Sequence, residues 1–233
     1  MFSKRVWIAL LNTMFFVRTD LKTFGTEAKP DLQQYGNGKA YSFIKQTKML
    51  LEYFQKHLNL SEEFSEKFDI MFKHEYVNKG EILFRPESFS QKIIFIEKGL
   101  IRTYYLKDGK DITYLFLSEN SFLTPIDCVF FNKPAPYGWE ALEKCEIRVA
   151  DYRNFELLFT EVPGMEKFIR LLLVNVLHTI AEKLYAIQFQ TAQDRYKKLL
   201  ETQPDILLRA PLGHIASYLG ITQQTLSVIR SGK

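Results

Sequence analysis

The side chains best suited to specific recognition chemistry lie near the end of the chain, where amides, hydroxyls and a guanidinium recur. Residues 212–219 place apolar side chains at i, i+3, i+4 and i+7, which predicts one face of a short helix. Gly220 is suited to end that helix, and Thr222 is suited to cap a second one. The exposed side chains of the second helix are expected to be Gln223, Gln224, Thr225, Ser227 and Arg230.

Such a helix can enter the major groove of a duplex, where glutamine and arginine pair with base edges. Ala216 is small where a second helix must cross closely, and Leu226 and Ile229 supply a buried side. An ordinary helical hairpin in a core is the alternative. The coincidence of cap, turn glycine, small residue and hydrogen-bonding face favours a helix-turn-helix. The predicted DNA-binding residues are Thr222, Gln223, Gln224, Thr225, Ser227, Arg230 and Lys233.

The charge of the chain is unevenly distributed, although its formal net charge is only +4. Residues 192–233 carry six Lys and Arg against three Asp and Glu, whereas residues 49–191 carry 17 against 21. A basic end joined to a slightly acidic middle suits a sensor attached to a polyanion-binding unit. Phosphate contacts are expected from Arg195, Lys197, Lys198, Arg209, Arg230 and Lys233.

The middle of the chain has the alternating and β-branched pattern of short strands. Turn pairs recur between these runs, and Asp108-Gly109 is the strongest hairpin signal. Strands about ten residues apart indicate an antiparallel roll or barrel. They are predicted at residues 75–77, 82–84, 93–96, 100–106, 112–117, 139–142 and 145–150.

Helical periods flank this region. Helices are predicted around residues 50–58, from Ser61, at 154–160 and at 192–201, with a long helix from Pro163 to about Gln190. Apolar residues on the long helix recur at spacings of 4, 4, 3, 4 and 3, which favours a coiled-coil seam in a parallel homodimer. The alternative is a helix lying on its own roll, and both can hold because more than one face is apolar. The predicted dimer-interface residues are Ile169, Leu173, Leu177, Ile180, Leu184 and Ile187.

Residues 1–48 show no regular period and are expected to form a poorly ordered extension. Lys4 and Arg5 precede an apolar run, as at the start of a secretion signal, but Asn12 and Thr13 interrupt it and no convincing cleavage site follows. The run is too short to span a membrane. The favoured interpretation is that Met49 is the natural start, which the mass of the native N-terminal peptide tests.

Cys128 and Cys145 are too few for a disulfide framework, a zinc site or an iron–sulfur cluster. We expect packed core thiols, rather than redox sensors, in a reducing cytoplasm. The chain has no Gly-rich phosphate loop, paired metal-ligand spacing or nucleophile motif. We therefore expect no enzyme activity, no cofactor and no metal. The 20 Phe and 12 Tyr are interpreted as core packing rather than a platform for single strands.

Together these features resemble the Crp/Fnr family of bacterial transcription regulators, in the style of Bacteroidetes-type members with a cyclic-nucleotide-binding-like domain. The resemblance covers about residues 50–233. It is carried by the strings FIEKGLIR (95–102), ALEKCE (141–146) and AQDRY (192–196), and most specifically by residues 215–227. It implies an α+β fold: an antiparallel β-roll with flanking helices, a long dimerisation helix and a C-terminal helix-turn-helix.

The expected domains are 1–48 (extension), 49–162 (β-roll effector-type domain), 163–191 (dimerisation helix) and 192–233 (DNA-binding domain). The implied function is a dimeric, cytoplasmic, sequence-specific DNA-binding regulator. Its partners are double-stranded DNA, a second copy and possible further contacts with RNA polymerase or a small-molecule effector, with no membrane. The alternative is a small-molecule sensor with a vestigial DNA-binding end.

Departures from the family pattern are equally informative. Where members that bind cyclic AMP carry a Gly-Glu pair and an Arg-Ser/Thr pair, this chain has Pro125-Ile126 and Ala135-Pro136. A buried phosphate without a cation is unfavourable, so no cyclic AMP response is expected. A haem alternative would need an axial ligand, and His74 and His178 are interpreted instead as packed or solvated.

The recognition helix departs as well. Gln223, Gln224 and Val228 stand near positions where relatives often carry arginine. Glutamine pairs well with adenine, so a site with A·T character is expected.

Overall fold

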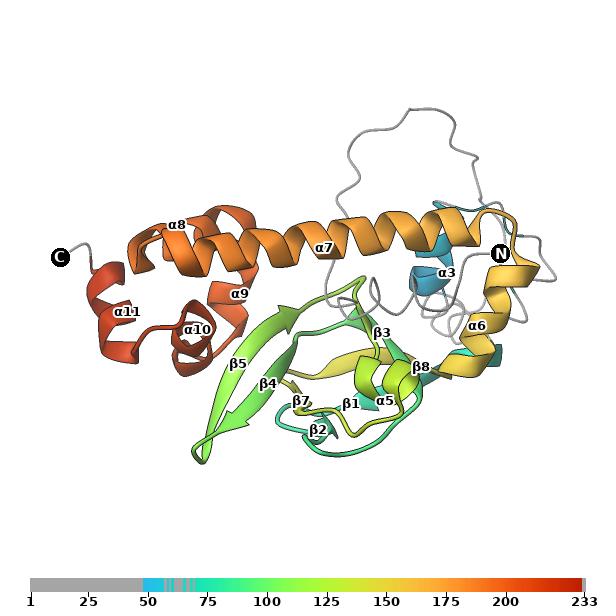
Figure 1. The fold of residues 1–233 in the computed structure, drawn as a ribbon, viewed down its shortest axis with the longest axis horizontal. Coiled ribbons are helices and arrows are strands. Elements are labelled where there is room, and N and C mark those ends of the chain that lie inside the picture. The colour runs from blue at the N-terminus through green and yellow to red at the C-terminus, as the bar shows by residue number, and fades with distance from the viewer. Residues whose placement is uncertain are drawn as a thin grey trace, which may run out of the picture.

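The computed structural model describes residues 48–56, 58, 60, 65, 68 and 70–231. Two predictions therefore lie outside the described residues: the extension before Lys48 and most of the helix from Ser61. Lys233, a predicted DNA-binding residue, also lies outside them. In Figure 1 a β-roll lies beneath a long helix, and the helices that follow it in the chain gather at its other end.

The roll consists of two four-stranded antiparallel sheets, in the orders β1-β8-β3-β6 and β2-β7-β4-β5. The predicted antiparallel α+β fold is confirmed. The sequence missed β6, which has only two residues. The strands are β1 (Lys73–Val77), β2 (Ile82–Phe84), β3 (Lys92–Lys98), β4 (Ile101–Lys107), β5 (Lys110–Leu117), β6 (Phe122–Leu123), β7 (Tyr137–Ala141) and β8 (Cys145–Asp151).

The hairpin between β4 and β5 turns at the predicted pair. Asp108 and Gly109 have φ values of 51° and 73°, as a two-residue turn with two left-handed positions requires. Lys107 pairs with Lys110 across it, which fixes the register of both strands. The hairpin is the part of the roll nearest the C-terminal helices (Figure 1).

Most of the helices lie along one side of the roll, and the long helix extends beyond it (Figure 1). Two of them, α5 and α9, were missed because six residues give too little periodicity to recognise. The described helices are α3 (Lys48–Gln55), α5 (Ile126–Phe131), α6 (Tyr152–Glu161), α7 (Met165–Phe189), α8 (Ala192–Thr202), α9 (Pro204–Arg209), α10 (Leu212–Leu219) and α11 (Gln223–Arg230). No helix in the described part of the chain is long and apolar enough to cross a lipid bilayer.

Two clusters of buried side chains belong to the roll and its flanking helices. One joins α3, α6 and the first half of α7 to β3, with Phe54, Phe95 and Phe155 among its members. The other fills the space between the two sheets around Tyr137 and Trp139. The aromatic residues that the structure describes are thus largely core residues, as their abundance indicated.

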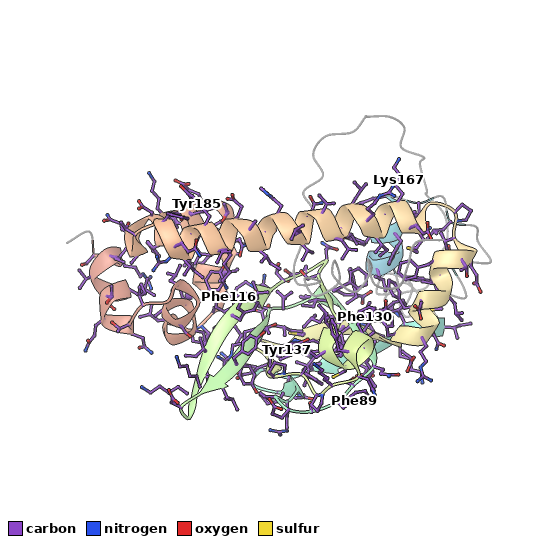
Figure 2. The ribbon with its side chains drawn as sticks, viewed as in Figure 1. Phe89, Phe116, Phe130, Tyr137, Lys167 and Tyr185 are labelled. Atoms are coloured by element: carbon purple, nitrogen blue, oxygen red, sulfur yellow. The ribbon has the colours of Figure 1, made fainter. Side chains whose placement is uncertain are left out.

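A third cluster crosses between the roll and the C-terminal helices. It combines Leu100, Phe116 and Leu142 of the roll with Leu199, Ile206, Ile215, Ala216, Leu219 and Leu226. Figure 2 shows Phe116 at this junction. The C-terminal helices therefore share a core with the outer face of the β4–β5 sheet.

The inward face of α7 contains part of the predicted coiled-coil seam. Ile169 and Leu173 are buried in the cluster beneath α3 and α6, so neither is available to a second copy in this arrangement. The sequence pattern did not distinguish the face that covers the roll from the face that points away. Tyr185 marks the outer side, projecting away from the roll (Figure 2).

Candidate nucleic-acid interface

Helices α10 and α11 are joined by a tight turn whose residues have the expected roles. Gly220 adopts φ 68°, ψ 33°, and its N–H bonds to carbonyls of the last turn of α10. The Thr222 hydroxyl accepts a hydrogen bond from the Thr225 N–H (3.1 Å) and caps α11. Ala216 and Leu226 are buried, as predicted for the contact between the two helices.

The outer face of α11 is polar and open to solvent. Gln223, Gln224, Thr225, Ser227 and Arg230 are all exposed. Two hydroxyls already serve the helix: Thr225 Oγ1 lies 2.9 Å from Thr222 Oγ1, and Ser227 donates to the Gln223 carbonyl (3.0 Å). Within the described part of the chain, the Gln224 and Arg230 side chains form neither hydrogen bonds nor ion pairs, which leaves their donors unoccupied.

Gln223 lies close to the start of α10. A Cβ atom added to Gly213 would be 2.5 Å from Gln223 Nε2, so the glycine leaves room for this amide. The position of the first side chain of α11 therefore depends on a residue of the neighbouring helix. Nothing in the sequence pattern around Gly213 indicates this role.

The structure changes the expectation for the phosphate-binding cations. Arg209 is not free for phosphate, because its guanidinium donates to Glu119 (2.7 Å) and Glu143 (2.5 Å) of the roll. These hydrogen bonds raise the pKa of Arg209, and Arg209 helps to hold the pKa of Glu119 below its usual value. Carboxylates of the roll already neutralise Arg209 in this arrangement, and its contact with phosphate stays a prediction.

Two other cations in that set are also partly engaged. Arg195 donates to the carbonyls of Leu219 (3.1 Å) and Gln190 (2.7 Å), and Lys198 pairs with Glu182 (2.5 Å). Arg195 thereby fastens α8 to the end of α10. Lys197 and Arg230 remain exposed.

Polar contacts complete the attachment of α10 to the roll. Arg102 of β4 donates to Nδ1 of His214 (3.0 Å) and to Asp111 (2.6 Å), and the Thr113 N–H donates to Ser217 Oγ (2.9 Å). Burial, together with the charge of Arg102, lowers the pKa of His214. A histidine that had no partner by sequence thus joins two parts of the molecule.

The interior of the roll is filled at the expected nucleotide position. The Ile126 N–H donates to Tyr137 Oη (3.0 Å), and Ala135 is fully buried. The rings of Phe84 and Tyr105 lie beside Trp139 and Tyr137, with centroids 5.0 and 5.7 Å apart, respectively. Burial raises the pKa of Tyr105 to about 12.

The two buried arginines of the roll are already hydrogen-bonded to other groups of the protein. Arg102 faces α10, and Arg148 donates to Glu97 (3.0 Å) and to the Phe72 carbonyl (3.2 Å). Neither guanidinium is available to a phosphate inside the roll.

Both cysteines are buried and unpaired. The Cys145 thiol donates to main-chain carbonyls, and burial raises its pKa to about 11, so it is a poor nucleophile. The described residues contain no group of three or more His, Cys, Asp or Glu arranged to hold a metal ion.

The fold and the exposed helix define a class of protein: an antiparallel β-roll joined by a long helix to a C-terminal pair of helices. Residues 74–161 match the family model described as cyclic nucleotide-binding domain. A comparison of the sequence with curated proteins gives no significant match.

Comparison with solved structures shows which proteins have a similar fold. A CooA mutant from Carboxydothermus hydrogenoformans aligns with TM-score 0.61 and 22% identity, over 74% of this chain and 80% of its own. The c-di-GMP responsive global regulator CLP of Xanthomonas campestris aligns with TM-score 0.57 and 14% identity, over 72% and 88%. A protein from Eubacterium rectale, described as a transcriptional regulator of the Crp/Fnr family, aligns with TM-score 0.59 and 16% identity, over 74% and 83%.

These findings confirm the predicted resemblance: the chain has the fold of the Crp/Fnr regulators. Two of these three neighbours are described as regulators and none as an enzyme.

Proposed function

We propose that the protein is a sequence-specific DNA-binding transcription regulator that acts as a homodimer in the cytoplasm. The observation that carries this proposal is the outer face of α11, whose exposed amides and guanidinium are mounted on a helix capped by Thr222 and anchored by buried Leu226. A helix with this face presents side chains that pair with base edges in the major groove. Exposed Val228 adds an apolar group suited to a thymine methyl, in keeping with A·T character.

The dimer contact is proposed on the outer face of α7. Val174, Leu177 and Leu184 are 57%, 48% and 54% exposed, and with exposed Ala181 they recur at spacings of 3, 4 and 3. That repeat fits a coiled-coil seam with a second copy. Leu177 and Leu184 belong to the originally predicted set, whereas Val174 and Ala181 replace the inward Ile169 and Leu173. Two recognition helices paired in this way would read half-sites ~34 Å apart.

The roll is proposed not to respond to cyclic AMP. Tyr137 and Trp139 fill its interior, and its buried arginines are bonded to other groups. A cyclic phosphate placed there would be desolvated without a cation. Titration of the full chain with cyclic AMP in a calorimeter is expected to give no saturable heat, and a saturable signal would contradict this part of the proposal.

The central test is selection of duplexes by the purified full chain from a random library at low ionic strength. We expect an enriched two-fold symmetric sequence whose binding weakens steeply with salt. Arg230→Ala should lower affinity and reduce the salt slope by about 1. The matched control is Lys167→Ala, an exposed cation at the far end of α7 (Figure 2), which should change neither. Failure to bind any duplex would favour the alternative, a sensor with a vestigial DNA-binding end.

A further inference from the structure

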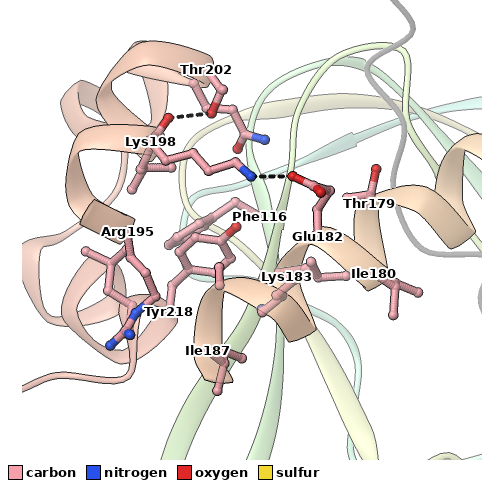
Figure 3. A pocket seen from close by; sticks show the side chains of 15 residues that line it. Phe116, Thr179, Ile180, Glu182, Lys183, Ile187, Arg195, Lys198, Thr202 and Tyr218 are labelled. Carbon is pink, nitrogen blue, oxygen red and sulfur yellow. Dashed lines mark hydrogen bonds and ion pairs between the residues drawn. The ribbon is translucent and has the colours of Figure 1, made fainter. Parts of the chain in front are cut away.

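A cavity lies where the long helix, the roll and the C-terminal helices meet (Figure 3). Its volume is about 140 Å³, and its lining comes from α7, β5, α8 and α10. The apolar part of the lining includes Leu115, Phe116, Ile180 and Leu199. None of the roll's expected nucleotide-binding positions contributes to it.

The polar part of the lining has an excess of positive charge. Lys183, Arg195 and Lys198 line the cavity together with a single carboxylate, Glu182. Lys198 already pairs with Glu182 (2.5 Å), as Figure 3 shows. In the described part of the chain neither Lys183 nor Arg195 forms an ion pair with a carboxylate. Their charges are met only by main-chain carbonyls and aromatic faces.

Lys183 is held between a main-chain carbonyl and two aromatic rings. Its ammonium donates to the Tyr114 carbonyl and lies 4.3 and 4.4 Å from the ring centroids of Tyr114 and Tyr218. Burial lowers the pKa of Lys183 to about 7. A buried ammonium without a counter-charge is unfavourable, and an anion beside it would restore the charged form.

We propose that this cavity binds a small apolar carboxylate, about the size of benzoate, with its hydrocarbon part among the apolar side chains and its carboxylate among the cations. The size follows from the volume, because an apolar cavity of about 150 Å³ holds benzene. Pockets for larger ligands begin at about 300 Å³, so a nucleotide is too large. This binding does not depend on the proposed DNA-binding function.

The cavity lies beside the proposed dimer seam. Two of the α7 residues that line it, Ile180 and Ile187, lie one helical turn from Leu177 and Leu184 and therefore adjoin the seam. Lys183 lies on the opposite side of the helix from Val174, so the buried cation points away from the seam. A ligand here would contact the roll, the long helix and the C-terminal helices at once.

Binding is tested with the full chain by ¹⁹F NMR of 4-fluorobenzoate, with benzoate and its neutral isostere benzyl alcohol as competitors. Benzoate is expected to compete at least tenfold better than benzyl alcohol. Lys183→Met, which keeps the length of the side chain, should weaken the binding of 4-fluorobenzoate at least tenfold. Lys197→Met, on an exposed side chain of α8 outside the cavity, should leave binding unchanged. Equal competition by both compounds, or equal binding by the two variants, would overturn the proposal.

Two further measurements keep the test decisive if Lys183→Met folds poorly. Ala186→Leu fills the cavity and should abolish binding, and retained binding would place the site elsewhere. The wild-type affinity should fall about tenfold per pH unit above 7, because the neutral amine must regain a proton before the anion binds. The titratable and charged groups that face Lys183 are Tyr114 on β5, Tyr218 on α10, Arg195 and Lys198 on α8, and Glu182 on α7. Burial raises the pKa of both tyrosines, so they stay neutral in this range. A flat profile between pH 6 and 9 would contradict the assignment to Lys183.

Discussion

The guanidinium of Arg209 in α9 lies 2.5 Å from Glu143 of the roll, in the loop between β7 and β8. Glu119, which follows β5, accepts from the same guanidinium and also from the Gly99 N–H (2.9 Å). One arginine thus joins two segments of the roll to the C-terminal helices, and Glu119 links a third segment through Gly99. Together with the shared cluster around Phe116, it makes the attachment of the C-terminal helices a specific interface.

Replacing Arg209 with methionine is expected to lower the free energy of unfolding by about 1–2 kcal/mol. Hydrogen bonds to charged groups contribute about 1.5–3 kcal/mol, and the 21% exposure of this side chain reduces that figure. Urea denaturation measures the change. Arg230→Met, on an exposed side chain, is the matched control and should cost less than about 0.5 kcal/mol.

Arg209→Met also distinguishes a structural role for Arg209 from a phosphate contact. If Arg209 serves the interface, Arg209→Met leaves the salt slope of DNA binding unchanged, whereas a phosphate contact would lower the slope by about 1. A lowered slope would show that the arginine leaves Glu143 and contacts phosphate when DNA binds.

The contact between His214 and Arg102 makes the interface sensitive to acid. Burial and the charge of Arg102 lower the pKa of His214 in the folded protein, against smaller opposing effects of Asp111 and Glu140. Below pH 6.5 His214 is therefore protonated to a greater extent in the unfolded chain than in the folded chain. The free energy of unfolding must therefore decrease as the pH is lowered through this window, by at most about 1.4 kcal/mol per pH unit.

His214→Gln tests this dependence, since an amide oxygen can still accept from Arg102. Between pH 7.5 and 5.5 the wild type is expected to lose more stability in urea denaturation than the variant. All other titrating groups are common to both proteins, so the difference isolates His214. Equal losses would mean that His214 takes up its proton as readily in the folded state.

The outer face of α7 provides the prediction for assembly. Leu184→Glu places a charge in the proposed seam and should convert a dimer to a monomer in sedimentation at micromolar concentration. Leu157→Glu on α6 is the matched control, because Leu157 is equally exposed (54%) but lies outside the seam. A wild-type chain that sediments as a monomer would refute the dimer directly.

The sequence predicted those elements whose signal is local. The β4–β5 hairpin turns where Asp108-Gly109 requires it, and Gly220 and Thr222 end and begin helices by their own backbone and hydroxyl chemistry. The order of helices and strands follows from periods of 3.6 and 2. Short elements such as α5 and α9 give no such period.

Partners distant in the chain could not be predicted. Arg209 has the composition of a DNA contact, yet it is paired with carboxylates 66 and 90 residues earlier. Ile169 and Leu173 satisfy a seam pattern, but the same pattern describes a helix that covers its own roll. His214 and Lys183 acquire their partners only when α10 and α7 meet β4 and β5.

The contact between Gly213 and Gln223 gives the sharpest test of the recognition face. Gln223→Ala removes the amide, and discrimination at one base pair should fall by about 1–3 kcal/mol while other positions are unaffected. Gly213→Ala leaves the amide present but displaces it, because the new Cβ would lie 2.5 Å from Nε2. Alanine also favours the helix, so stability should stay unchanged or rise by up to about 1 kcal/mol.

Both substitutions should therefore relax selectivity at the same base pair, measured by competition among duplexes that differ at each position. The double variant should behave like Gln223→Ala alone, because Gly213→Ala acts only through the amide. Additive losses would mean that Gly213 influences DNA binding by a separate route. A uniform loss over all sequences would make Gln223 a backbone contact, and base reading would then rest on Gln224 and Arg230.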